Sequence, residues 1–110
     1  MKRLFFQEAY NQALKSEMNF NHGAVLIYRG KIIGRGYNTY YNTNSNKKRS
    51  LHAEVSAILD GLKKIKVEDL KRCELVIIRV NSQGECVNSK PCQHCTNFIM
   101  KHSIKKVYYS

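Results

Sequence analysis

The chain has 110 residues and a mass of 12.8 kDa, which is the size of one domain. Its composition, 43% hydrophobic and 25% charged with one proline and six glycines, excludes a collagen-like or proline-rich disordered chain. Nineteen lysines and arginines against eight acidic residues give a formal charge of +11, which favours nucleic acid, nucleotides or an acidic partner. A gene that is rich in A and T encodes a similar excess of lysine, so the net charge alone does not identify a ligand.

The N-terminus and the cysteines together predict a cytoplasmic protein. Phe5-Phe6 belongs to a start that resembles a secretory signal, but the apolar stretch stops at Gln7, short of the ~7–15 residues that such a signal needs. The apolar runs are also far shorter than the ~20 residues that cross a bilayer, so we expect no membrane association. Four cysteines in a reducing compartment favour metal binding or catalysis over disulfides.

The first half of the chain predicts a helix, a hairpin and a loop. Apolar residues recur at helical spacing over residues 2–18. Two β-rich runs, residues 23–28 and 31–37, flank Arg29-Gly30 and predict an antiparallel hairpin. Residues 38–50 are polar and predict a long loop. Tyr40, Tyr41 and the run Lys47-Lys48-Arg49 could hold a phosphate or stack on bases, but a solvated loop is the favoured account of most of them.

The second half predicts two helices and two strands. Ser50 is a suitable N-cap for a helix from Leu51 to about Leu62. A β-branched run predicts a buried strand over residues 74–80, followed by a loop. Pro91 suits the first position of a third helix, which continues to Met100, and residues 104–109 predict a last strand.

This order of elements predicts an α/β fold in a single domain, residues 1–110. Strands that are separated by helices favour parallel pairing. We therefore expect a three-layer α/β/α sandwich with a mixed sheet of about four strands and an initial antiparallel hairpin. The chain stops after the fourth predicted strand and leaves a sheet edge, for which we expect cover from a second copy in a homo-oligomer.

Two short motifs at predicted helix starts carry the chemistry. They are His52-Ala53-Glu54 and the run Pro91-Cys92-Gln93-His94-Cys95. Cysteines three apart share a helix face, and a third ligand at His52 would complete a His/Cys/Cys zinc site with an open fourth position for water. A carboxylate at Glu54 could take the proton of such a water. Spacing alone does not bring Glu54 to the metal, because residues two apart lie on nearly opposite sides of a helix.

The combination matches the H-x-E and P-C-x-x-C signature of zinc deaminases. From Gly23 to Tyr109 the chain resembles the cytidine and deoxycytidylate deaminase superfamily, including the stretch Gly36-Tyr37-Asn38 at the end of the hairpin. The resemblance implies one zinc ion per chain, held by His52, Cys92 and Cys95, with Glu54 as the catalytic proton shuttle. It also implies that Asn38 contacts the sugar of the substrate.

Two further residues complete the candidate substrate-binding set. Ala53 lies between His52 and Glu54, and His22 precedes the first predicted strand, where it could line the pocket or merely cap the hairpin. Cys73 stands at the start of the predicted buried strand, and we expect it to be an ordinary reduced cysteine that is buried there.

The implied enzyme is a hydrolase of a C–N bond in a cyclic amidine. Zinc-bound hydroxide would attack the amine-bearing carbon of cytosine in a nucleotide or nucleoside, such as CMP, dCMP or cytidine. The products would be the uracil form and ammonia. Lys90 departs from relatives that act on tRNA adenosine, guanine or pterin-like rings, which carry Glu at this position, and it favours cytosine.

Other functions stay open at this level. One is a deaminase that edits cytosine or adenine in single-stranded RNA or DNA, which the charge would serve. Another is a non-catalytic, zinc-stabilised basic module that binds nucleic acid, in which His94 or His102 completes a structural zinc site. A small nucleoside or nucleotide is the favoured partner, ahead of nucleic acid.

Overall fold

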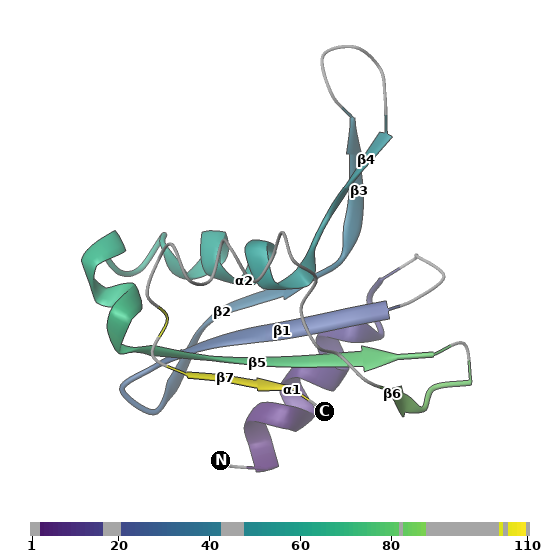
Figure 1. The fold of residues 1–110 in the computed structure, drawn as a ribbon, viewed down its shortest axis with the longest axis horizontal. Helices are drawn as coiled ribbons and strands as arrows, with labels where there is room; N and C mark the ends of the chain where they lie inside the picture. Colours follow the sequence, from purple (N-terminus) through teal and green to yellow (C-terminus); the bar gives the residue numbers. More distant parts are fainter. Residues whose placement is uncertain are drawn as a thin grey trace.

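The computed structural model describes residues 3–16, 21–42, 48–81, 83–87, 104 and 106–109 (Figure 1). In chain order the elements are α1 (Arg3–Ala13), β1 (Asn21–Tyr28), β2 (Lys31–Tyr37), β3 (Thr39–Asn42), β4 (Lys48–Leu51), α2 (Ala53–Gly61), the 3₁₀ helix η1 (Val67–Arg72), β5 (Cys73–Val80), β6 (Cys86–Val87) and β7 (Lys106–Tyr109). The predicted third helix, residues 91–100, lies outside the described residues.

The main sheet is mixed, as the sequence predicts. Its strands run in the order β2-β1-β5, and both β6 and β7 pair with the far edge of β5. The hairpin β1–β2 is antiparallel and β5–β7 is parallel. The pairing of β1 with β5 is antiparallel. The expected parallel pairing across a helix is wrong there, because β1 lies between β2 and β5, the two like-directed strands that α2 connects.

Two helices cover opposite faces of this sheet and give the three layers (Figure 1). On one face α1 packs through Phe5, Ala9 and Ala13 against strand residues such as Val25 and Val76. On the other, an apolar cluster joins α2 and η1 to the sheet, and it comprises Ala24, Leu26, Ala53, Ala57, Ile58, Leu70, Cys73, Leu75 and Ile77. Residues alternate between the two clusters along β1 and β5, as pleated strands require.

Glycines let both helices approach the sheet closely. A Cβ on Gly23 of β1 would collide with the backbone of α1 at Ala9 and Ala13. Gly36 of β2 stands in the same relation to the α2 backbone at Ala53 and Ala57. Only glycine permits such backbone-to-backbone contact, so these positions fix the distance of each helix from the sheet.

The predicted loop over residues 38–50 is wrong in part, because its flanks form a second, two-stranded sheet. Thr39–Asn42 and Lys48–Leu51 pair antiparallel with each other, and within the described residues they join no strand of the main sheet. Ser50 therefore lies in β4 opposite Tyr40. The predicted N-cap at Ser50 is corrected to His52, and α2 begins at Ala53.

The bounds of α1 and of the loop after β5 also differ from expectation. The first helix ends at Ala13 instead of Met18, since Lys15 and Ser16 donate to the carbonyls three residues earlier in a closing turn. The predicted loop over residues 81–90 includes β6, whose two residues pair with Arg79 and Val80. No helix in the described parts of the chain is long and apolar enough to span a membrane.

Candidate active site at the start of helix α2

Four chain segments meet at one end of the main sheet. Gly36 holds the first turn of α2 against the carboxyl end of β2. The register of β1 places its first residues beside the ends of β2 and β5. Ligand sites of open α/β sheets lie at the carboxyl ends of strands, and a helix N-terminus adds partial positive charge. The His52-Ala53-Glu54 motif therefore lies at the end of the sheet where folds of this kind bind their ligands.

Asn38 is a buried link between β1 and β2, with 6% of its surface exposed. Its Oδ1 accepts a hydrogen bond from the backbone N–H of His22 at 2.7 Å, and its own N–H donates to the His22 carbonyl at 3.2 Å. Ser16 Oγ donates to the Asn38 carbonyl at 2.8 Å. The Asn38 side chain therefore helps to hold the end of β2 against the start of β1.

The β3–β4 pairing brings Asn38 and His52 together, although they are far apart in sequence. Thr39 is the register partner of Leu51, so residues 38 and 52 immediately flank the first pair of that small sheet. His52 has extended backbone angles, and its carbonyl accepts the N–H of Ser56 at 3.0 Å in the first turn of α2. Its imidazole makes no capping hydrogen bond to the helix.

Glu54 lies in the first turn of α2 with 5% of its surface exposed. Within the described residues it forms no ion pair, although acidic residues are almost never buried without a partner. The helix N-terminus favours its negative charge. Glu54 is thus a buried acid at the start of the helix that follows His52, at the end of the sheet where ligands bind in this kind of fold.

Ala53 and His22, the other candidate contacts, lie at this end of the sheet. Ala53 is fully buried and its side chain belongs to the apolar core, so only its backbone could face a substrate. His22 precedes Ala24 by two residues on β1, and Ala24 packs on the α2 side of the sheet. Strand alternation therefore places His22 on that same side.

Arg79 is a candidate that the sequence patterns do not single out. It is the register partner of His22, and it follows Leu75 and Ile77 on the α2 face of β5. Arg79 and His22 are therefore neighbours at the site end of the sheet, on the face that is covered by α2 with Glu54 in its first turn. In the sequence Arg79 is the one basic residue within the β-branched run of residues 74–80. The alternation of side chains along the strand places it on the same side as Leu75 and Ile77, which pack toward α2.

The three predicted metal ligands lie partly within and partly outside the described residues. His52 is described, whereas Cys92 and Cys95 lie outside the described residues. Within the part of the chain that the structure describes, no three His, Cys, Asp or Glu side chains could hold a metal together. The chemistry of the proposed set fits zinc, which binds an imidazole nitrogen and two thiolates.

Cys73 is buried and unsuited to metal binding or nucleophilic chemistry. Burial, and secondly the charge of Asp69, raises the pKa of its thiol from 9.0 to about 11. The thiol therefore stays protonated at neutral pH, and its Sγ lies 3.5 Å from the Asp69 carbonyl as a weak donor. This confirms the expected burial of a reduced cysteine at the start of the strand.

Comparison with known proteins shows the family of the chain. The family model "Cytidine and deoxycytidylate deaminase zinc-binding region" matches residues 1–110. The chain resembles a tRNA-specific adenosine deaminase of Buchnera aphidicola with 29% identity over 87 residues, which is 79% of this chain and 49% of that protein. The chain spans about half the length of the curated relatives it matches.

Solved structures that share the fold include the following two. One is the dCMP deaminase of cyanophage S-TIM5 in complex with dCMP and dUMP, with TM-score 0.60, 22% identity, and coverage of 99% of this chain and 82% of that one. The other is a cytidine deaminase of Burkholderia pseudomallei, with TM-score 0.70, 18% identity, and coverage of 94% and 78%. The match across all 110 residues shows that the chain belongs to the cytidine and deoxycytidylate deaminase family, of which it carries the zinc-binding region.

Proposed function

We propose that this chain is a hydrolytic deaminase that replaces the exocyclic amino group of a nucleobase with oxygen, consuming water and releasing ammonia. The observation that carries the proposal is the buried carboxylate of Glu54, two residues after His52, at the end of the sheet where β2 and β5 both finish. Family membership supports the reaction class, and the buried acid supports a catalytic use of the site.

His52, Cys92 and Cys95 are the proposed holders of one zinc ion. When bound, zinc supplies Lewis acidity, which makes water a nucleophile near neutral pH. The position of His52 directly before α2 supports this role, because its backbone is fixed by the helix on one side and by β4 on the other.

Glu54 is the proposed proton carrier. It takes a proton from the attacking water and delivers it to the ring nitrogen next to the reacting carbon. It then carries the second proton to the amino group, which leaves as ammonia while the ring keeps the oxygen as a carbonyl. Burial supports this role, since a carboxylate shielded from bulk solvent exchanges protons with the attacking water and the substrate instead of with solvent.

The favoured substrate is a cytosine nucleotide. Lys90 before Pro91 supports cytosine over the purine and pterin branches. Arg79 with His22 on the α2 face supports a phosphorylated substrate over a free nucleoside, since a guanidinium binds phosphate through paired donors. Asn38 beside them is the proposed sugar contact, and the Ala53 backbone lines the same first turn.

A base within single-stranded nucleic acid is the second candidate. The excess of positive charge supports it, and so does the name of the curated relatives, which are tRNA-specific adenosine deaminases. A homo-oligomer also stays a proposal, which the mass of the purified protein in solution would test.

Ammonia release from a panel of substrates tests the proposal directly. The panel comprises dCMP, CMP, deoxycytidine, cytidine, AMP, and cytosine- and adenine-containing oligonucleotides. We expect turnover of dCMP or CMP with about one zinc per chain. No release from any of these substrates by a zinc-loaded protein would refute the catalytic function and favour the non-catalytic module.

A further inference from the structure

The small sheet β3–β4 stands apart from the body of the protein. Figure 1 shows both strands rising from the start of α2, away from the main sheet and from α1. They pair with each other, and in the described residues no third strand joins them. Two-stranded sheets on their own are at best marginally stable in water, which favours a ligand or partner that orders them.

The segment that contains this small sheet has basic residues but no acidic residues. From Asn38 to Ala53 there is no Asp or Glu, while three basic residues occur in a row, namely Lys47, Lys48 and Arg49. Lys48 and Arg49 lie within β4, where they are the register partners of Asn42 and Tyr41. The strands thus combine two cations with the aromatic residues Tyr40 and Tyr41, the residue types that hold phosphate and stack on bases.

The base of the small sheet coincides with the candidate active site. Its first register pair, Thr39 with Leu51, is flanked by Asn38 and His52. Four residues per strand extend it ~13 Å from that point at the usual rise of a strand. A chain of phosphates that follows the small sheet would therefore arrive at the residues proposed to bind the sugar and the metal.

We infer that β3–β4 is a binding arm for single-stranded nucleic acid, which it holds by its phosphodiester backbone while one base enters the site. The inference rests on the proposed function and favours its second candidate substrate. Single strands are favoured because the reacting base must lie outside a duplex stack. A second copy of this chain is a poorer occupant, since it would bring another formal charge of +11 to a segment that contains no acid.

Binding of labelled single-stranded RNA and DNA 20-mers at several salt concentrations tests the arm. The test variant is Lys48→Gln with Arg49→Gln. The matched control is Arg29→Gln with Lys31→Gln, which removes the same two residue types from the β1–β2 hairpin, at the end of the main sheet opposite the site. We expect the slope of log affinity against log salt to fall by about 1.4 in the test variant, at about 0.7 for each lost phosphate contact. The control should keep the wild-type slope.

Three outcomes would overturn the arm. Undetectable binding by the wild type is the first, and equal loss in test and control variants is the second, since diffuse charge would then explain the affinity. The third is a wild-type dimer, without nucleic acid, that the test variant abolishes. Circular dichroism confirms that each variant is folded before it is compared.

Turnover separates this inference from the proposed function. If the arm acts on the substrate, the test variant lowers the ratio of kcat/KM on an oligonucleotide to kcat/KM on the mononucleotide by about tenfold. Mononucleotide turnover without oligonucleotide binding would overturn the arm and leave the deaminase intact. Salt-dependent binding through β4 without turnover of any substrate would do the reverse.

Discussion

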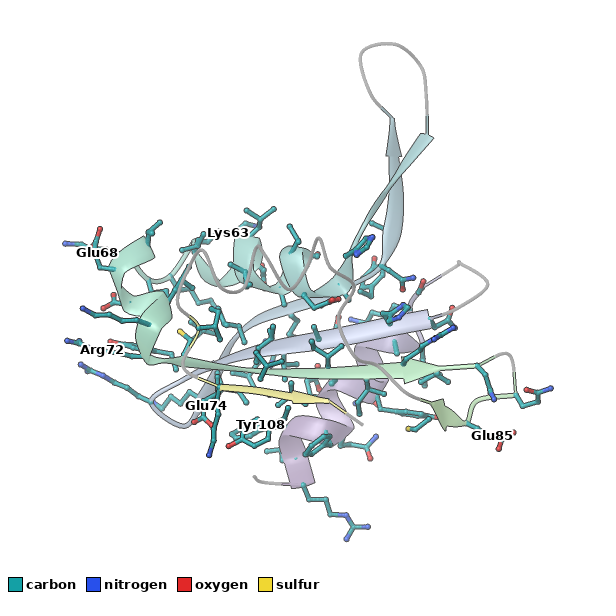
Figure 2. The ribbon with its side chains drawn as sticks, in the orientation of Figure 1. Lys63, Glu68, Arg72, Glu74, Glu85 and Tyr108 are labelled. Carbon is teal, nitrogen blue, oxygen red and sulfur yellow. The ribbon has the colours of Figure 1, made fainter. Side chains whose placement is uncertain are left out.

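The two faces of the main sheet are built differently. The α1 face is held by large side chains and by contacts at its rim, such as Tyr10 Oη donating to the Gly84 carbonyl at 3.0 Å and the Glu8–Arg35 ion pair at 3.0 Å. Tyr108 of β7 also lies on this face beside α1 (Figure 2). Both faces bring small residues of helix and strand into backbone contact, at Gly23 against α1 and at Gly36 against α2. The faces differ in what the helix carries, because the first turn of α2 holds the motif residue Glu54, whereas α1 adds the contacts at the rim.

A second contrast is between the two ends of the molecule. Figure 2 shows Lys63, Glu68 and Arg72 around the end of α2 and on η1, at the end of the molecule opposite β3–β4. Their ion pairs, Lys63–Asp60 at 3.6 Å and Arg72–Asp69 at 3.9 Å, are exposed i,i+3 contacts. Such exposed pairs contribute about 0–1 kcal/mol each, so they add little to the stability of that end of the molecule.

The largest expected effect is at Glu54 on the α2 face. Glu54→Gln keeps the size of the side chain but removes its capacity to carry a proton, so turnover should fall by at least ~10²–10⁴-fold. Zinc content and thermal stability should stay near the wild type, because none of the three proposed ligands changes. Ammonia release measured with metal analysis checks this, and wild-type turnover in the variant would show that Glu54 is not the proton carrier.

The glycines test whether the faces differ as described. Gly36→Ala forces α2 away from β2 and should cost about 1–3 kcal/mol of unfolding free energy, together with a loss of zinc affinity. Gly23→Ala on the α1 face should cost a similar free energy but leave zinc affinity unchanged. Chemical denaturation and zinc titration of both variants measure the two effects. Equal loss of zinc affinity would contradict the division of roles.

Arg79 tests how far the α2 face extends as a binding surface. Arg79→Gln should raise KM for dCMP by roughly 10- to 100-fold, since a charge-assisted contact contributes roughly 1.5–3 kcal/mol. KM for deoxycytidine, which lacks the phosphate, should stay unchanged. Steady-state kinetics on the two substrates give the comparison, and an equal change on both would assign Arg79 a structural role instead.

The smallest effect concerns the rim of the α1 face. The hydrogen bond from Gln12, followed by the contacts with Arg35, holds the pKa of Glu8 below its ordinary value of 4.5 against the opposing effect of burial. The resulting stabilisation is present above pH 4.5 and is lost as pH falls through the lowered pKa. Because both side chains are partly exposed, we expect at most about 1 kcal/mol.

Melting temperatures of the wild type and Glu8→Gln across acidic pH measure this contribution. The difference between the two proteins should be largest near neutral pH and should vanish once Glu8 is protonated. Turnover should not depend on this variant. A difference that persists at the acidic end would mean that packing, and not the carboxylate charge, accounts for it.

Sequence periodicity predicts the parts of the fold that bury an apolar face. The β1–β2 hairpin, α2 and β5 were predicted close to their observed bounds because helical and strand spacing is visible in their apolar residues. β3 and β4 were missed because Thr-Tyr-Tyr-Asn and Lys-Arg-Ser-Leu show no apolar alternation. Strands that join no larger sheet lack the selection for a core face that produces such a pattern.

For the candidate site too, the sequence predicts what depends on short spacing and not what depends on distant pairings. The motif around His52 and Glu54 was recognisable because its chemistry needs particular residue types at short spacing. Arg79 was not, because its proximity to His22 arises from strand register, which the sequence encodes only through distant pairings. The roles of Cys92 and Cys95 stay predictions, since both residues lie outside the described part of the chain.

The way the chain passes through β3 and β4 has a consequence for how this protein could diversify. It leaves the body after Asn38 and returns at His52 along neighbouring strands, so the spacing of these two residues is set by the first register pair and not by what lies beyond it. Insertions or exchanges past that pair can alter recognition without displacing the residues at its base. The small sheet is therefore a segment that can lengthen or change in sequence while the spacing of Asn38 and His52 is kept.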